Sequence, residues 1–166
     1  MLVAALGFVL ISSKSLVQEL KLRKLAIAIV VTGTLLSGRS GLAGEVKDSK
    51  SSVEVLLRAE RLDDSAVGYA GERTVTYDAF SQLYKAGKAS TDDAKHLIAD
   101  ATPEGRVYGL LILRHIAPAD AEMWTKRMLL DRARVTVMNG CLIHHSTVGE
   151  LVAKIQGGES IISLPR

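Results

Sequence analysis

The stretch Thr102-Pro-Glu-Gly-Arg-Val-Tyr-Gly-Leu-Leu-Ile-Leu113 contains the clearest helix start in the chain. Thr102 is a preferred N-cap residue, and Pro103 at the first helical position lacks only an N–H that has no intrahelical partner there. Glu104 suits the positive end of the helix dipole. Apolar residues then surround the helix almost completely, which predicts a central place in the core. Pro118 ends this helix one or two residues before itself.

The sequence on either side predicts further short amphipathic helices, because apolar residues recur at intervals of three and four. Capping boxes of the form Ser/Thr-x-x-Glu begin the first and last of them, and glycines close the second and the last. The expected helices run from Ser51 to Arg61–Asp64, Thr76 to Ala86, Thr91 to Asp100, Pro118 to Leu129 and Thr147 to Ile155.

The fold class predicted from this pattern is all-α, with short antiparallel helix pairs in a HEAT-like or irregular bundle. Val135-Thr-Val137 alternates like a strand. A lone strand has no partner in the rest of the pattern, so a helix or an extended connector is predicted there. The apolar tail Ile161-Ile-Ser-Leu164 is expected to pack back onto the bundle.

An apolar leader precedes this domain. Lys21, Arg23 and Lys24 come before an apolar run from Leu25 to Gly38, which is the order of a secretory signal peptide. The run is shorter than the roughly 20 residues that span a bilayer, so cleavage is favoured over a permanent membrane anchor.

Small residues at Gly41 and Ala43 fit a signal peptidase site. We therefore expect residues 1–43 to be a signal peptide, 44–50 a flexible lead-in and 51–166 a single α-helical domain. No cysteine stands at the expected cleavage point after the apolar run, which excludes a lipid-anchored form. The mature protein is expected to be periplasmic or secreted, without a stable membrane anchor.

A second apolar run, from Met1 to Ile11, precedes the basic residues. A normal signal peptide does not need such a run, and the run is too short to cross a membrane. We expect translation to start after Met1, at a non-Met codon between Val17 and Leu22, which would give the signal a conventional basic beginning.

The positive charge of the chain belongs to its leader. The whole sequence has 21 basic and 18 acidic residues, a net charge of +3. The leader holds five of the basic residues and one of the acidic ones, which leaves the mature part almost neutral. This balance removes the basic footprint typical of nucleic-acid-binding proteins.

One motif offers metal ligands or a nucleophile. Cys141-Leu-Ile-His144-His145 would gather a thiol and two imidazoles on one face of a helix, as zinc ligands. Zinc normally takes three or four protein ligands, and the remaining histidines are His96 and His115. A cysteine nucleophile assisted by histidine is the enzymatic alternative, but no third, orienting group is identifiable. The competing interpretation is a buried Cys141 beside surface or capping histidines.

Two other residues are candidates for contact with a partner. Tyr69 lies in a glycine-flanked turn, where we expect an aromatic side chain to be exposed for recognition. Arg106 lies in the first turn of an otherwise apolar helix. It is expected either to form a salt bridge with Asp100 or Glu104 or to contact an anionic group of a partner.

The segment from Leu97 to Leu113 resembles a HEAT-like repeat, in which a short helix, a proline-containing turn and an arginine precede a leucine-rich second helix. The resemblance extends over residues 76–156, and similar segments occur in exported bacterial proteins. It implies a protein-binding surface without catalytic residues. We therefore hypothesise an exported helical module that binds a protein partner and needs no cofactor, of which an envelope immunity protein is one form. The alternative is a metal- or thiol-dependent activity, with zinc, at Cys141 and the two histidines.

Overall fold

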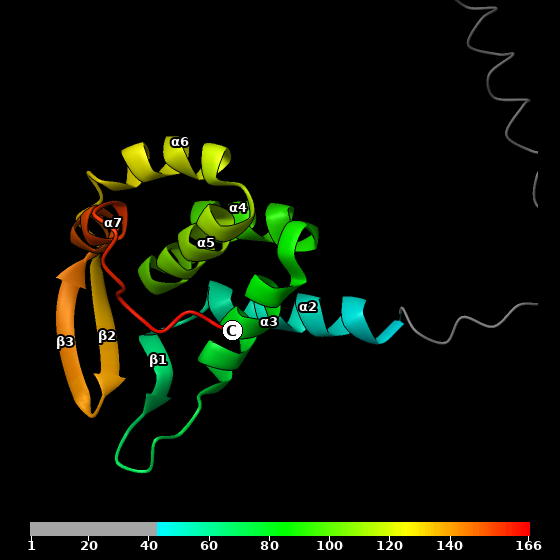
Figure 1. Cartoon of the computed structure of the whole chain (residues 1–166), viewed down its shortest axis with the longest axis horizontal. Coiled ribbons are helices and arrows are strands. Elements are labelled where there is room, and N and C mark those ends of the chain that lie inside the picture. Colours follow the sequence, from blue (N-terminus) through cyan, green and yellow to red (C-terminus); the bar gives the residue numbers. More distant parts are fainter. Residues whose placement is uncertain (1–42) are drawn as a thin grey trace, which may run out of the picture. The chain divides into compact units, whose positions relative to one another are not determined.

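The computed structural model describes residues 43–166, with side chains from Ser49 onward. These residues form a mostly helical body with a small mixed sheet (Figure 1). The elements in chain order are α2 (Ala43–Leu57), β1 (Leu62–Val67), α3 (Val75–Ala86), the 3₁₀ turn η1 (Gly87–Ser90), α4 (Thr91–Asp100), α5 (Pro103–Ile116), α6 (Pro118–Met128), β2 (Arg134–Gly140), β3 (Leu142–Thr147) and α7 (Val148–Gln156). The predicted signal peptide up to residue 42 and the predicted translation start lie outside the described residues, and Ala43, its predicted last residue, is the first residue of α2.

Helix α5 occupies the centre of the core, as its sequence predicts. The Thr102 hydroxyl accepts the N–H of Gly105 at 3.3 Å and donates to the carbonyl of Ala59 at 2.6 Å, so the cap also ties α5 to the chain after α2. A Cβ atom at Gly105 would lie 2.2 Å from the Leu56 carbonyl oxygen, and glycine therefore allows the two backbones to approach. The fully buried side chains of α5 are Val107, Tyr108, Leu110, Ile112 and Leu113.

The capping signals also predict the neighbouring helices well. The bounds of α3, α4 and α6 agree with expectation to within a residue or so. At the start of α7, the Thr147 hydroxyl accepts the Glu150 N–H while the Glu150 carboxylate accepts the Thr147 N–H, which is the predicted capping box. The tail returns to the core through Ile161 and Ile162, whereas Leu164 stays about half exposed. None of the helices in the described range combines the length and apolarity needed to cross a membrane.

The prediction for the first helix is wrong at both ends. Helix α2 starts at Ala43, so residues 44–50 are helical and Ser51 lies inside the helix instead of capping it. A Ser-x-x-Glu pattern is compatible with a helix interior as well as with a cap, and only the preceding turn distinguishes them. The helix ends at Leu57, and residues 62–67 form strand β1 where a helix end was expected.

The all-α prediction holds only for the larger part of the fold, because a three-stranded sheet of order β1-β2-β3 is present. Strand β2 covers the segment predicted as a helix or connector. It pairs with β1 in parallel, with Leu62 beside Val137, and with β3 antiparallel, with Thr136 beside His145. Its partners escaped prediction because β1 carries two aspartates and β3 two histidines, so neither alternates cleanly between apolar and polar.

Candidate protein-interaction surface

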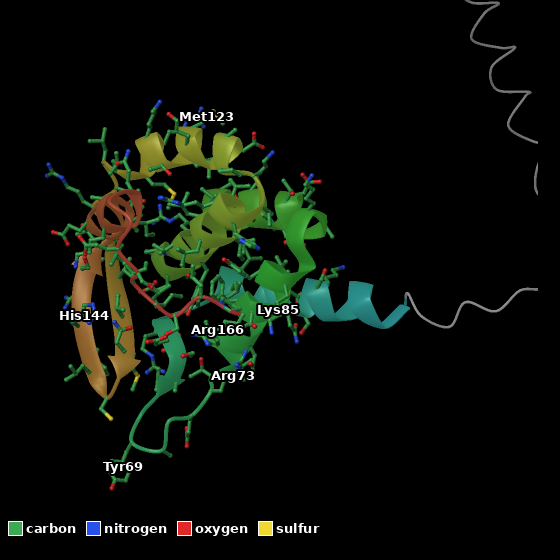
Figure 2. The ribbon with its side chains drawn as sticks, viewed as in Figure 1. Tyr69, Arg73, Lys85, Met123, His144 and Arg166 are labelled. Atoms are coloured by element: carbon green, nitrogen blue, oxygen red, sulfur yellow. The ribbon has the colours of Figure 1, made fainter. Side chains whose placement is uncertain are left out.

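Tyr69 is presented on a turn whose backbone is held by hydrogen bonds. Val67 and Glu72 exchange N–H to carbonyl bonds of 2.9 and 2.7 Å, and the Gly71 N–H donates to the Gly68 carbonyl at 3.2 Å. Both glycines have positive φ, of 73° and 64°, which a residue with a Cβ rarely adopts. The side chain of Tyr69 is fully exposed and points away from the body (Figure 2). The predicted exposure of Tyr69 is confirmed.

The turn of the β2–β3 hairpin lies beside this loop. The Gly68 N–H donates to the carbonyl of Gly140 at 2.9 Å, which fastens the loop to the tip of the hairpin. Cys141 is exposed at that tip, and Leu142 is 74% exposed. We call Tyr69, Cys141 and Leu142 the tip surface. It gathers two large apolar side chains and a thiol that no neighbouring element covers within the described part of the chain.

The structure changes the geometry of the predicted zinc or thiol site. Cys141 is exposed at the hairpin turn, so the prediction of a buried cysteine is wrong. His144 and His145 lie in a strand instead of a helix, and successive strand residues point to opposite faces. His144 pairs with the buried Val137, whereas His145 lies beside Thr136 on the other face, its Nδ1 3.4 Å from the threonine hydroxyl. In residues 43–166 no group of three or more His, Cys, Asp or Glu side chains is arranged to hold a metal ion.

Arg106 forms an ion pair, but with a residue that the sequence pattern did not indicate. Its Nη1 lies 2.5 Å from a carboxylate oxygen of Asp131, and both side chains are mostly buried. Asp131 also accepts the N–H of Ala133 at 2.9 Å. The pair therefore holds α5 to the connection between α6 and β2 through Nη1, while the buried Nε of Arg106 has no hydrogen-bond partner among the described residues. The expected partners Asp100 and Glu104 have other contacts.

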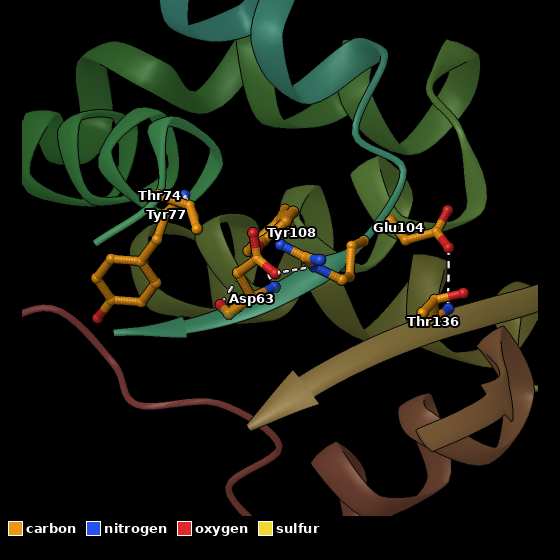
Figure 3. A network of polar contacts seen from close by, with 7 residues as sticks. Asp63, Thr74, Tyr77, Glu104, Tyr108 and Thr136 are labelled. Carbon is orange, nitrogen blue, oxygen red and sulfur yellow. Dashed lines mark hydrogen bonds and ion pairs between the residues drawn. The ribbon is translucent and has the colours of Figure 1, made fainter. Parts of the chain in front are cut away.

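A buried polar cluster lies at the β1 side of the sheet (Figure 3). The Tyr108 hydroxyl accepts the N–H of Asp63 at 2.7 Å and donates to the carbonyl of the same residue at 3.2 Å. Burial raises the pKa of Tyr108 far above its ordinary value, so the hydroxyl keeps the proton that it donates. The carboxylate of Asp63 is buried and lies 2.5 Å from Nε of Arg61. This cluster satisfies the backbone of β1 on the side away from β2.

Two further contacts complete this side of the sheet. The Glu104 carboxylate, one helical turn before Tyr108, accepts the N–H of Thr136 at 2.9 Å. The N–H of Ser163 in the C-terminal tail donates to the Asp64 carboxylate at 2.8 Å, and the Tyr77 hydroxyl donates to the Ser163 carbonyl at 2.8 Å. We call Asp63, Asp64 and Thr136, with the side chains and tail that cover them, the closed edge. The polar groups of the closed edge form hydrogen bonds with one another, so we expect them to stabilise the fold.

Two hollows lie on the described surface away from the tip. One of about 240 Å³ lies between α3, α5 and the tail, where the rings of Tyr84 and His115 stack with centroids 4.0 Å apart. This volume is below the roughly 300–1,000 Å³ of typical ligand pockets. Another, of about 420 Å³, is lined by Arg58, Arg61 and Asp63, of which the last two already bind each other. Ser160 lines the first hollow together with His115, but its hydroxyl donates to the carbonyl of Ile162 at 2.7 Å instead of to the imidazole.

Comparisons of the chain with protein-family models, with curated proteins and with solved structures give no significant match. The resemblance of residues 76–156 to a HEAT-like repeat therefore stays a prediction. The case for a function rests on the surface of the molecule itself.

Sequence reasoning identified Tyr69 and missed Leu142. The signal that could have placed Leu142 is Asn139-Gly140, which follows the alternating segment Val135-Thr-Val137. Asn-Gly beside alternating apolar residues is a strong hairpin indicator. Had the hairpin been recognised, Cys141 and Leu142 would have been expected at an exposed tip.

Proposed function

We propose that this chain is an exported module that binds a protein partner through the tip surface. The observation that carries the proposal is Tyr69, a fully exposed aromatic side chain on a hydrogen-bonded turn. Soluble proteins expose large apolar residues singly, but here Leu142 lies on the adjoining hairpin tip.

A rigid aromatic anchor suits protein recognition on physical grounds. Tyrosine buries a large area while losing the freedom of only two side-chain torsions, and it carries a hydroxyl that can keep a hydrogen bond. A turn that is already ordered has little backbone entropy left to lose on binding. Both arguments favour Tyr69 as the energetic centre of a contact, with Leu142 beside it.

The sequence supports the rest of the proposal. The basic residues followed by an apolar run before Ala43 are typical of a signal for export, and the almost neutral mature part favours a partner other than nucleic acid. Export is tested by N-terminal sequencing. A mature chain that begins at Gly44 is expected, and recovery of the intact leader from the cell surface or culture fluid would contradict it.

The binding proposal is tested by affinity capture with matched variants. The mature chain is immobilised and exposed to envelope extract, and captured proteins are identified by mass spectrometry. Tyr69→Ala is expected to lower the affinity for the captured partner at least tenfold, since central aromatic anchors contribute about 2 kcal/mol or more. Leu130→Ala is the control, because Leu130 is as exposed as a tip residue but lies before β2, at the end remote from the hairpin turn. Equal affinities for the two variants would refute the tip surface as the contact.

A further inference from the structure

The outer edge of β3 is the part of the sheet that the described chain leaves uncovered. Figure 1 shows β3 as the outermost strand, with no helix alongside its outer edge. From Leu142 to His145 every side chain is exposed. Natural edge strands are usually protected by charged residues, proline, bulges or covering elements. β3, Leu-Ile-His-His-Ser-Thr, contains no charged carboxylate, lysine, arginine or proline, and its register with β2 is regular throughout.

The hydrogen bond from the Thr136 N–H to Glu104 shows which backbone groups of β3 point outward. The Thr136 N–H is donated to Glu104, away from β3, so Thr136 and His145 form a pair without mutual hydrogen bonds. The N–H and carbonyl of His145 therefore point away from β2, and those of Ile143 and Thr147 do too, because the direction alternates along a strand. The Thr147 N–H confirms this alternation, since it donates outward to the Glu150 carboxylate at 3.0 Å.

The capping box limits the free part of the edge. The Glu150 carboxylate accepts the N–H of Thr147. The hydrogen bond from the Ser146 hydroxyl and, to a smaller extent, that from the Thr147 N–H lower the pKa of Glu150, which keeps the carboxylate ionised as an acceptor. Within residues 43–166 the outward N–H and carbonyl groups of Ile143 and His145 have no partner. These four outward backbone groups therefore lie symmetrically on either side of His144.

We propose that β3 pairs antiparallel with β3 of a second copy of this chain, about a two-fold axis at His144. In this register Ile143 of each copy lies opposite His145 of the other, and each such pair exchanges both of its backbone hydrogen bonds. Every free N–H and carbonyl of Ile143 and His145 is then satisfied on both copies. A register shifted by two residues would place Ile143 opposite Thr147, whose N–H is already bound to Glu150.

A second copy also fits the charge and the extent of the edge. The strand carries no lysine, arginine or carboxylate, so no permanently charged side chains of like sign face each other across the pair. A pair of six-residue strands is small beside the roughly 1,200 Å² at which standard interfaces begin, so the dimer is expected to be weak and to form in concentrated protein. Tyr69 and Cys141 lie beyond the paired segment, and Leu142, the first residue of β3, is the one residue that this edge shares with the tip surface.

Disulfide cross-linking of the full chain tests the register. In a Cys141→Ser background, His144→Cys places two thiols directly opposite each other across the axis, where neighbouring Cβ atoms are about 4.5–5.5 Å apart. His145→Cys is the matched control, because that position is also exposed but lies opposite Ile143 of the other copy. With oxidised glutathione as oxidant, the first variant is expected to form covalent dimer at least tenfold faster. Equal rates, or no dimer from either, would overturn the proposal.

Sedimentation equilibrium of the chain with its native β3 gives a second, independent measurement. Ile143→Lys introduces a charge at the edge and is expected to raise the dimer dissociation constant at least tenfold, whereas Tyr69→Ala should leave it unchanged. A monomer at every concentration, or a dimer that Ile143→Lys does not weaken, would overturn the proposal. Loss of partner capture in Tyr69→Ala with the dimer intact would show that the two surfaces act separately.

Discussion

The closed edge and the outer edge of β3 belong to the same three-stranded sheet, but the chain treats them differently. Along the closed edge, Tyr108 and Glu104 of α5 bind the outward backbone of β1 and β2, and the tail adds Ser163. Along β3, the side chains from Leu142 to His145 are exposed. On the outer edge of this strand, the described chain supplies a hydrogen-bond acceptor only for the N–H of Thr147. The backbone groups of the closed edge are thus hydrogen-bonded by side chains of α5, and those of the outer edge of β3 can bind another strand.

This difference separates stability from function in the molecule. Buried backbone groups that lose a partner cost free energy, because they give up hydrogen bonds to water. Substitutions at the closed edge should therefore destabilise the fold. Exposed groups at β3 and at the tip surface keep their water, so substitutions there should change binding with little effect on folding.

The largest expected effect is that of Tyr108→Phe. This change removes the hydroxyl from a fully buried position and leaves the N–H and carbonyl of Asp63 without their partner. The free energy of unfolding, measured by urea denaturation, should fall by about 1–3 kcal/mol. Tyr69→Phe removes the same hydroxyl from an exposed side chain and should change the value by less than about 0.5 kcal/mol. Equal losses would show that the closed edge is not sealed as described.

Glu104→Ala should have the next largest effect. The buried carboxylate accepts the Thr136 N–H, and its removal orphans that donor at a cost of about 1–2 kcal/mol. Glu104→Gln keeps an acceptor oxygen and should retain most of the stability. Denaturation of the two variants side by side distinguishes the hydrogen bond from the charge. A glutamine variant as unstable as the alanine variant would mean that the charge itself is required.

Asp64 should make a smaller contribution, and one that depends on pH. Burial acts to raise the pKa of Asp64, but hydrogen bonds from Ser163 and Ser65 outweigh it and lower the pKa below the ordinary 3.8. A carboxyl with a lowered pKa in the folded state stabilises the fold above its unfolded pKa, and that contribution is lost as the pH falls through the folded pKa. Asp64→Asn should therefore cost about 0.5–1 kcal/mol at neutral pH, since the carboxylate is partly exposed.

The cost of Asp64→Asn should shrink when both proteins are unfolded in acid. Urea denaturation at neutral pH and again well below pH 3.8 measures this. A cost that stayed constant over this range would mean that the ionised carboxylate does not hold the tail.

The smallest expected effect on stability is that of Ile143→Lys. Ile143 is 55% exposed at the edge of β3, so the free energy of unfolding of dilute monomer should change by less than about 0.5 kcal/mol. Val137→Ala, in the buried partner strand, should cost more, because it leaves a cavity in the core. A large loss from Ile143→Lys would show that the edge is covered in solution by this chain itself.

Most of the helical fold could be predicted because its signals are local. Thr102 with Pro103 marks the start of α5, and Thr147 with Glu150 marks the start of α7, through bonds that close within one turn. The exposure of Tyr69 followed from the flanking glycines in the same way. Arg106 shows the limit of such reasoning, because its partner Asp131 is far along the chain and no local pattern indicates it.

The sequence by itself determined the helix starts around the central α5, the exposed aromatic turn and the almost neutral charge of residues 44–166, because capping, periodicity and charge depend on the local sequence. Only the tertiary structure decided that Val135-Thr-Val137 is a strand, that Cys141 is exposed, and that His144 and His145 face opposite ways. Strand pairing joins residues as distant as Leu62 and Val137, and a strand exists only when its partner supplies the other half of the hydrogen bonds. The two edges of the sheet follow from that non-local pairing. The closed edge has its backbone hydrogen bonds satisfied within the chain, and the outer edge of β3 has backbone groups that can bind another strand.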